Sequence, residues 1–467
     1  MSPLSGPDAA GTTPVTLPRW YAARRGSADP LVHQAGSADV PVPRAGSADL
    51  LVRLDAARDL ADGPDRVDRL TELAAEADAA GPPELALAVR VELLDALDRA
   101  GTGWRMPSVL RRCRSTVEEI DPGTADLLDH FQRRIVALAV GTLRITLDVA
   151  YAMLADLERR DPAGTPGLVG LRAELAAQAG DEPAATDALL AWLTTTAPEL
   201  ITTLPDISIR RTPANLMIDL AGQGVAGECA ACVACRQADV LADRATRPGT
   251  GPLTGRDADA AAIRVVEPVL AGRSQCPEQP ERALAATVLP LLRLGRYAEA
   301  AAAHVTAYRR HRDELAAFPR MATHLRFCAL AEHPARGLDI LLAQRPRLAG
   351  AVDDRSRMEF AAAGTLVCRR TVGAGVTKAG ATKAGVTKAG ATEASATEAS
   401  ATVAGSAASL DPSDVASLGA ELLATARDLA DRFDARNGGD HQRRRLAGWW
   451  AEPPPATGPA PSDETQP

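Results

Sequence analysis

Aromatic residues are scarce in this sequence, and their scarcity limits the folds that it can adopt. Phe, Trp and Tyr together make up 3% of the 467 residues, too few for the core of a β-sandwich or β-barrel rich in aromatic side chains. No Val/Ile-rich strand pattern alternates with helical segments, which argues against a doubly wound sheet. Alanine and leucine dominate instead, so the composition favours an all-α protein.

Lysine is rare, whereas arginine is common. Lys and Arg together number 52, and only three of these residues are lysine: Lys378, Lys383 and Lys388. A preference for Arg over Lys, together with many Ala, Gly and Pro residues, is typical of a GC-rich bacterial coding sequence. This bias describes codon usage and indicates no function.

The chain lacks the basic charge of a nucleic-acid-binding protein and the apolar run of a membrane protein. Its net charge is −8, and its arginines are dispersed among Asp and Glu, as on solvated helix faces. No apolar run reaches the roughly 18 residues that a membrane span needs, and residues 135–157 are interrupted by Arg144, Asp148 and Asp156. The seven cysteines are an odd number, and no apolar signal core precedes them. We therefore expect a cytoplasmic protein with no nucleic-acid and no membrane partner.

Catalytic motifs are missing. The sequence contains no G-x-S-x-G and no P-loop, and the glycine-rich stretch at 249–256 lacks the P-loop lysine and spacing. No pair of carboxylates stands out as an acid/base dyad. The sequence therefore predicts a protein that is not an enzyme and that uses no cofactor.

The most informative stretch, at 281–313, predicts two helices joined by a tight turn at Leu294-Gly295-Arg296. Gly295 suits the left-handed conformation that ends a helix. Small or apolar residues share one face of each expected helix: Leu284, Val288 and Leu291 on the first, and Ala300, His304 and Ala307 on the second.

Similar turns recur along the chain. Gly180 and Gly255 are each followed five residues later by alanine, as Gly295 is, and Glu332 begins a degenerate copy. The turns at 255, 295 and 332 lie roughly 40 residues apart, near the period of two-helix solenoid repeats. The spacing favours a repeat array over the alternative, an irregular helical bundle.

The stretch at 281–313 resembles the second half of the tetratricopeptide repeat, a helix–turn–helix unit of about 34 residues. The turn glycine, the aromatic residue and the two small residues of that motif match Gly295, Tyr297, Ala300 and Ala307. The chain departs from the motif at Leu284, at Arg312 and at Pro290 inside the first helix. The resemblance implies a helical scaffold that binds other proteins, and it transfers no catalytic residue.

We therefore predict an all-α fold, an α-solenoid of tetratricopeptide-like repeats with disordered termini and a low-complexity insert that repeats every five residues. The predicted parts are a disordered tail at 1–47, N-terminal helical repeats at 48–200, an irregular seam at 201–228, C-terminal repeats at 229–370, the flexible insert at 371–410, capping helices at 411–451 and a second disordered tail at 452–467.

Four cysteines form the candidate metal site. Cys229, Cys232 and Cys235 have the C-x2-C-x2-C spacing of metal-ligating thiols, and a return helix over about 257–271 would bring Cys276 back beside them. These residues predict a structural zinc site, or a redox or iron–sulfur site. The alternative is that they are small apolar residues of a helix.

Other metal ligands also have helical spacing. His324 and Cys328 are four residues apart, and His304 and His311 lie nearby in sequence. No H-E-x-x-H motif accompanies them. We expect them to pack in a core.

The sequence favours a scaffold that binds a protein partner of unknown identity on the concave face of a helical array. The alternative is a regulatory or sensing helical-repeat module linked to a signalling or transcription system. Trp449 and Trp450 are interpreted as a cap on the end of the array, or as a partner-binding anchor.

Overall fold

The computed structural model describes residues 45–120, 128–161, 165–198, 230–247, 253–272, 276–350, 353–374 and 411–455. Within these ranges the protein is all-helical, with 17 α-helices and no strand. Helices pack against their neighbours in sequence order, as in a helical repeat. The predicted all-α fold is confirmed, and the type of solenoid stays a prediction.

The helices group into two compact units, which are described separately. The first comprises residues up to 139 together with 148–162 and 213–227, and the second comprises the rest. The N-terminal repeats predicted at 48–200 therefore belong partly to each unit. The helices of the first unit are α2 (Ala45–Arg58), α3 (Pro64–Ala80), α4 (Pro83–Arg99), α5 (Met106–Ile120), most of α6 (Asp129–Gly141) and most of α7 (Leu147–Arg160).

The core of the first unit follows the helical period of the sequence. Helical spacing in the sequence predicts one apolar face for α3, and the four residues of that face are all buried: Val67, Leu70, Leu73 and Ala77. By the same spacing, Leu60 is expected to continue the apolar face of Leu54 and Ala57. It is instead 41% exposed, because α2 ends at Arg58 and Leu60 lies after that end. Helix α2 also begins at Ala45, inside the predicted tail, since the last proline of that tail is Pro43.

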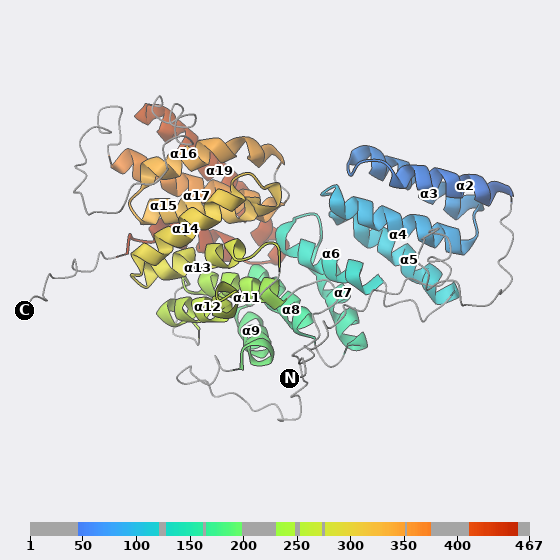
Figure 1. Ribbon diagram of the computed structural model, residues 1–467, viewed down its shortest axis with the longest axis horizontal. Coiled ribbons are helices and arrows are strands. Elements are labelled where there is room, and N and C mark those ends of the chain that lie inside the picture. Colours follow the sequence, from blue (N-terminus) through green and yellow to red (C-terminus); the bar gives the residue numbers. More distant parts are fainter. Residues whose placement is uncertain are drawn as a thin grey trace, which may run out of the picture. The chain divides into compact units, whose positions relative to one another are not determined.

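The second unit consists of consecutive helix pairs (Figure 1). The pairs are α8 (Pro166–Ala179) with α9 (Glu182–Thr196), α11 (Ala230–Arg244) with α12 (Gly255–Leu270), α13 (Glu281–Arg293) with α14 (Tyr297–His311), α15 (Met321–Leu330) with α16 (Pro334–Gln344), and α17 (Asp354–Gly373) with α19 (Pro412–Asn437). A last helix, α20 (His441–Ala451), follows α19.

Left-handed residues form the turns of three of these pairs, as the recurring turn pattern predicts. Gly180 and Gly295 have φ angles of 82° and 83°. The amide of Arg296 donates to the carbonyl of Leu291 at 2.9 Å and closes the end of α13. Glu332 has a φ of 60° in the turn between α15 and α16. Gly255 differs, since it begins α12.

Helices α17 and α19 form an antiparallel pair with a close approach at glycine. A Cβ at Gly419 would lie 2.9 Å from Cys368 Cβ, and one at Gly364 would lie 2.9 Å from Leu422 Cδ1. Helical spacing in the sequence also predicts one apolar face for α19, and its residues are buried: Val415, Leu418, Leu422, Ala426, Leu429 and Phe433. The predicted insert at 371–410 joins these helices. Its first residues close α17, and residues 375–410 lie outside the described ranges.

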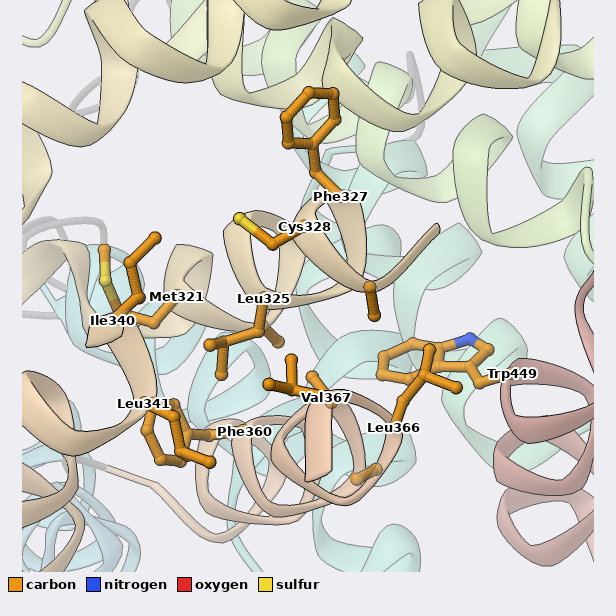
Figure 2. Packing of buried hydrophobic residues seen from close by; sticks show 14 of the residues in the cluster. Met321, Leu325, Phe327, Cys328, Ile340, Leu341, Phe360, Leu366, Val367 and Trp449 are labelled. Atoms are coloured by element: carbon orange, nitrogen blue, oxygen red, sulfur yellow. The ribbon is translucent and has the colours of Figure 1, made fainter. Parts of the chain in front are cut away.

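The second unit has two apolar clusters, one mainly from α13 to α20 and the other from α8 to the start of α13. Figure 2 shows Trp449 pointing from α20 toward Leu366 of α17. Trp449 is 4% exposed, so this side chain belongs to the core. Among the helices described here, none combines the length and the apolar character needed to cross a membrane.

Candidate functional site

The segment formed by α20 and Glu452 is bound by five helices of the second unit, and the position of α20 is set by the end of α19. Gly438 has a φ of 76° and ends α19. The buried carboxylate of Asp434 then accepts hydrogen bonds from the amides of Gln442 at 2.7 Å and Arg443 at 3.0 Å. These amides belong to the first turn of α20, where a carboxylate is favoured by the helix dipole. The two helices are thereby fixed at a tight corner.

The first contact of this segment is with the end of α8. The carbonyl of Gln178 accepts from Asn437 Nδ2 at 2.9 Å and from Gln442 Nε2 at 3.0 Å. Carbonyls in the last turn of a helix have no partner inside the helix. The side chains of Asn437 and Gln442 supply that partner.

Arg445 connects α20 to α11 and α17. Its Nε donates to Asp243 Oδ1 at 2.6 Å, and its Nη2 donates to Glu359 Oε1 at 2.7 Å. The Arg445 side chain is only 5% exposed. A guanidinium removed from water in this way is stable only with partners of opposite charge.

Trp449 contacts two guanidinium groups. The Cζ atom of Arg326, on α15, is 3.9 Å from the centre of the Trp449 ring system, and that of Arg445 is 4.7 Å from it. Both distances are within the range of a cation–π interaction. The tryptophan is therefore held by charge as well as by apolar packing.

Glu452 ends the segment with contacts to three arginines, of which Arg326 also contacts Trp449. Its carboxylate accepts from Arg293 Nε of α13 at 2.8 Å and from Arg326 Nη2 at 2.6 Å. Its carbonyl accepts from Arg370 of α17 at 3.1 Å. Glu452 is the first residue of the tail predicted at 452–467, and in the structure its carboxylate is paired and 15% exposed.

The ionisation states match this pairing. Burial raises the pKa of Glu452, but Arg326 and Arg293 outweigh burial and hold the pKa below its ordinary value. The pKa of Glu359 is likewise lowered, because Arg355 and Arg445 outweigh burial. Burial lowers the pKa of Arg326 to about 10, so this guanidinium stays charged at neutral pH.

We call the residues that bind this segment the α20-binding surface: Gln178, Asp243, Arg293, Arg326 and Glu359. They come from α8, α11, α13, α15 and α17, the first helix of each pair. On the bound segment, Arg445, Trp449 and Glu452 are spaced four and three residues apart and lie along one face. The surface thus recognises a basic, an aromatic and an acidic residue in helical register.

The predicted cysteine site is described only in part. Cys229 lies outside the described residues. The Sγ atoms of Cys232 and Cys276 lie 3.7 Å apart, whereas the buried Sγ of Cys235 accepts from Gln279 Nε2 at 3.4 Å. Within the described ranges, no three His, Cys, Asp or Glu residues are grouped so as to hold a metal ion. Zinc binding by the full set stays a prediction.

The histidines pack in the core, as expected. His324 and His304 are buried, and their Nδ1 atoms lie 3.1 Å apart. Cys328 Sγ lies 4.0 Å from His304 Nε2, and Phe327 stacks on the His304 ring. Burial lowers the pKa of His304 to about 4, so this histidine is neutral at neutral pH.

The α20-binding surface was not predicted from the sequence, although Trp449 and Trp450 were predicted to be a cap or a partner-binding anchor. Both tryptophans contact the inside of the second unit, since Trp450 Nε1 also donates to the carbonyl of Ala362 at 3.1 Å. The one local indication was the helical spacing of Arg445, Trp449 and Glu452. Their partners on other helices have no such pattern.

Comparisons with known proteins identify no relative. No family model matches the chain, and no curated protein and no solved structure matches it.

Proposed function

We propose that this protein is a non-enzymatic scaffold that binds a helical segment of a partner protein on the α20-binding surface. The observation that carries the proposal is the set of contacts to the segment formed by α20 and Glu452, to which five helices each provide a polar group. Binding of a helix in a groove by anchors spaced three and four residues apart is a common mode of peptide recognition.

The chemistry of the surface supports a protein ligand. Charged groups of both signs lie along it and are separated, with Asp243 and Glu359 at Arg445 and with Arg293 and Arg326 at Glu452. A small molecule would pair with only one part of this array. A helix with Arg, Trp and Glu at the spacing of α20 pairs with all of it.

The proposal requires that a partner helix replaces α20. Arg293 Nη2 and Arg326 Nε, both on the α20-binding surface, are buried and have no hydrogen-bond acceptor among the described residues. Buried donors without acceptors cost about 1–3 kcal/mol each. A partner that supplies acceptors at these atoms competes well with α20, and the tetratricopeptide-like pattern of α13 and α14 supports the same function.

Capture experiments with a variant in which α20 is detached from the α20-binding surface test this function. The double variant Arg445→Ala/Trp449→Ala removes two anchors of α20 and leaves the α20-binding surface unchanged. We expect it to retain from a cell lysate a protein that wild type retains weakly, and a peptide of residues 438–455 to elute that protein. A peptide with the same two substitutions is the matched control. Equal capture by both proteins, unaffected by the peptide, would contradict the proposal.

A further inference from the structure

Two thiols from distant parts of the sequence lie side by side in the second unit. Cys232 is in the first turn of α11, and Cys276 precedes α13 by a few residues. Their Sγ atoms are 3.7 Å apart across a sequence separation of 44 residues. Both side chains are half-buried, so a small reagent can reach them. A disulfide has an S–S distance of about 2.0 Å, which small side-chain rotations can achieve from this arrangement.

The surroundings favour reaction at this pair over the other described cysteines. Cys113, Cys328 and Cys368 are buried, and burial raises the pKa of each thiol. Cys235 is also buried and accepts a hydrogen bond from Gln279.

We propose that Cys232 and Cys276 form a reversible redox site, which is oxidised by small-molecule disulfides of the glutathione class. One thiol loses its proton and attacks the disulfide, so a mixed disulfide forms and one molecule of reduced thiol leaves. The second cysteine then loses its proton and attacks the protein sulfur of that mixed disulfide. The Cys232–Cys276 bond forms and a second reduced thiol leaves. The protein loses two electrons and two protons, and the small disulfide gains them.

This inference is independent of the proposed function, since neither cysteine belongs to the α20-binding surface. The redox site and the predicted zinc site also differ in the number of protein ligands that they require. A disulfide requires only the two thiols that the structure brings together, whereas tetrahedral zinc requires four ligands. The closed bond would link α11 to the segment before α13, and it would constrain the unfolded chain.

Oxidised glutathione distinguishes a pair from a single thiol. A lone cysteine keeps the glutathione adduct, whereas an adjacent cysteine displaces it. We expect intact wild-type protein to lose two hydrogen atoms in mass, with a Cys232–Cys276 cross-link in its peptide map. Cys232→Ser should retain glutathione on Cys276, and Cys276→Ser should retain it on Cys232. Cys235→Ser is the matched control and should behave as wild type.

The oxidised protein should also melt several degrees above the reduced protein, and dithiothreitol should reverse both changes. Circular dichroism checks that each variant is folded. Glutathione that persists on wild-type Cys232 or Cys276 would overturn the inference, as would no reaction at either residue. A cross-link that forms only after a chelator has removed bound zinc would also overturn it and would support the metal site instead.

Discussion

Glu332 has the backbone conformation that glycine has in two related turns. Its φ is 60°, and its side chain is exposed. A left-handed conformation costs an ordinary residue about 1 kcal/mol, and glycine avoids this cost. We expect Glu332→Gly to raise the free energy of unfolding by about 0.5 kcal/mol, after the greater flexibility of glycine in the unfolded chain is subtracted.

Urea denaturation measures this change. The matched control is Gly295→Ala at a φ of 83°, which we expect to lower the free energy of unfolding by about 1 kcal/mol. A destabilised Glu332→Gly variant would show that the Glu332 side chain makes a contact worth more than the strain.

Asp259 makes folding sensitive to pH. Burial raises the pKa of its carboxyl to about 6, although Arg293, with Nη1 at 3.0 Å from Oδ1, acts in the opposite direction. The folded state therefore holds the proton more tightly than the unfolded state does. The stability that this carboxyl contributes is present at low pH and is lost as the pH rises through about 6.

Asp259→Asn cannot ionise, so its stability relative to wild type should improve as the pH rises. We expect a gain of roughly 1–3 kcal/mol between about pH 4.5 and about pH 7.5, measured by urea denaturation at several pH values. Asp257→Asn is the control, since Asp257 is exposed on the same helix. Parallel pH profiles for wild type and Asp259→Asn would refute this assignment.

Neighbouring arginines on α20 provide a comparison of buried and exposed charge. Arg445 pairs with Asp243 and Glu359 and is buried, whereas Arg444 is 72% exposed and pairs only with Asp440. Arg445→Ala leaves two carboxylates buried without this partner, so we expect a loss of about 3–5 kcal/mol. Arg444→Ala should cost less than about 0.5 kcal/mol. Equal losses in denaturation would mean that α20 is not docked as described.

At the scale of elements, the α17–α19 pair should survive cleavage of its connection. The only lysines, Lys378, Lys383 and Lys388, lie in the predicted flexible insert. A lysine-specific protease should cut there quickly under native conditions. Because α19 buries its apolar stripe on α17, we expect the fragment that begins at residue 389 to stay bound to the larger fragment.

Gel filtration of the digest distinguishes the outcomes. Co-elution in buffer, with separation only in denaturant, is the expected result, and replacement of all three lysines by arginine is the uncut control. Separation in buffer would show that residues 411–450 form an independent module. Resistance to the protease would show that the insert is ordered.

The sequence was most informative where one helix buries one face. The stripe of α19 and the helix–turn–helix of α13 and α14 were predicted from spacing and a turn glycine, because a period of 3.6 residues determines which side chains face the core. The residues at which helices end were harder to predict from the sequence. Leu60 continued the stripe of α2 by spacing, but no residue in the sequence marked the end of that helix at Arg58.

At the scale of the whole molecule, the α20-binding surface could not be predicted from local patterns. Asp243 and Glu359 each resemble any charged residue of a helix, and only tertiary packing brings them to Arg445. The thiol pair was easier to anticipate, since a return helix was expected to bring Cys276 toward Cys232. In both cases, spacing in the sequence indicated one side of the contact, the anchors of α20 or the cysteines at 229–235. Packing of distant helices brought the other side to them.

The most direct test of the central claim is the affinity of a labelled peptide of residues 438–455 for the full chain carrying Arg445→Ala/Trp449→Ala. Fluorescence anisotropy should show saturable binding, because the released surface pairs with Arg445, Trp449 and Glu452 of the peptide. The peptide with the same two substitutions should bind at least about tenfold more weakly, as expected for the loss of two anchors. No binding of the native peptide to a protein that circular dichroism shows to be folded would contradict the claim.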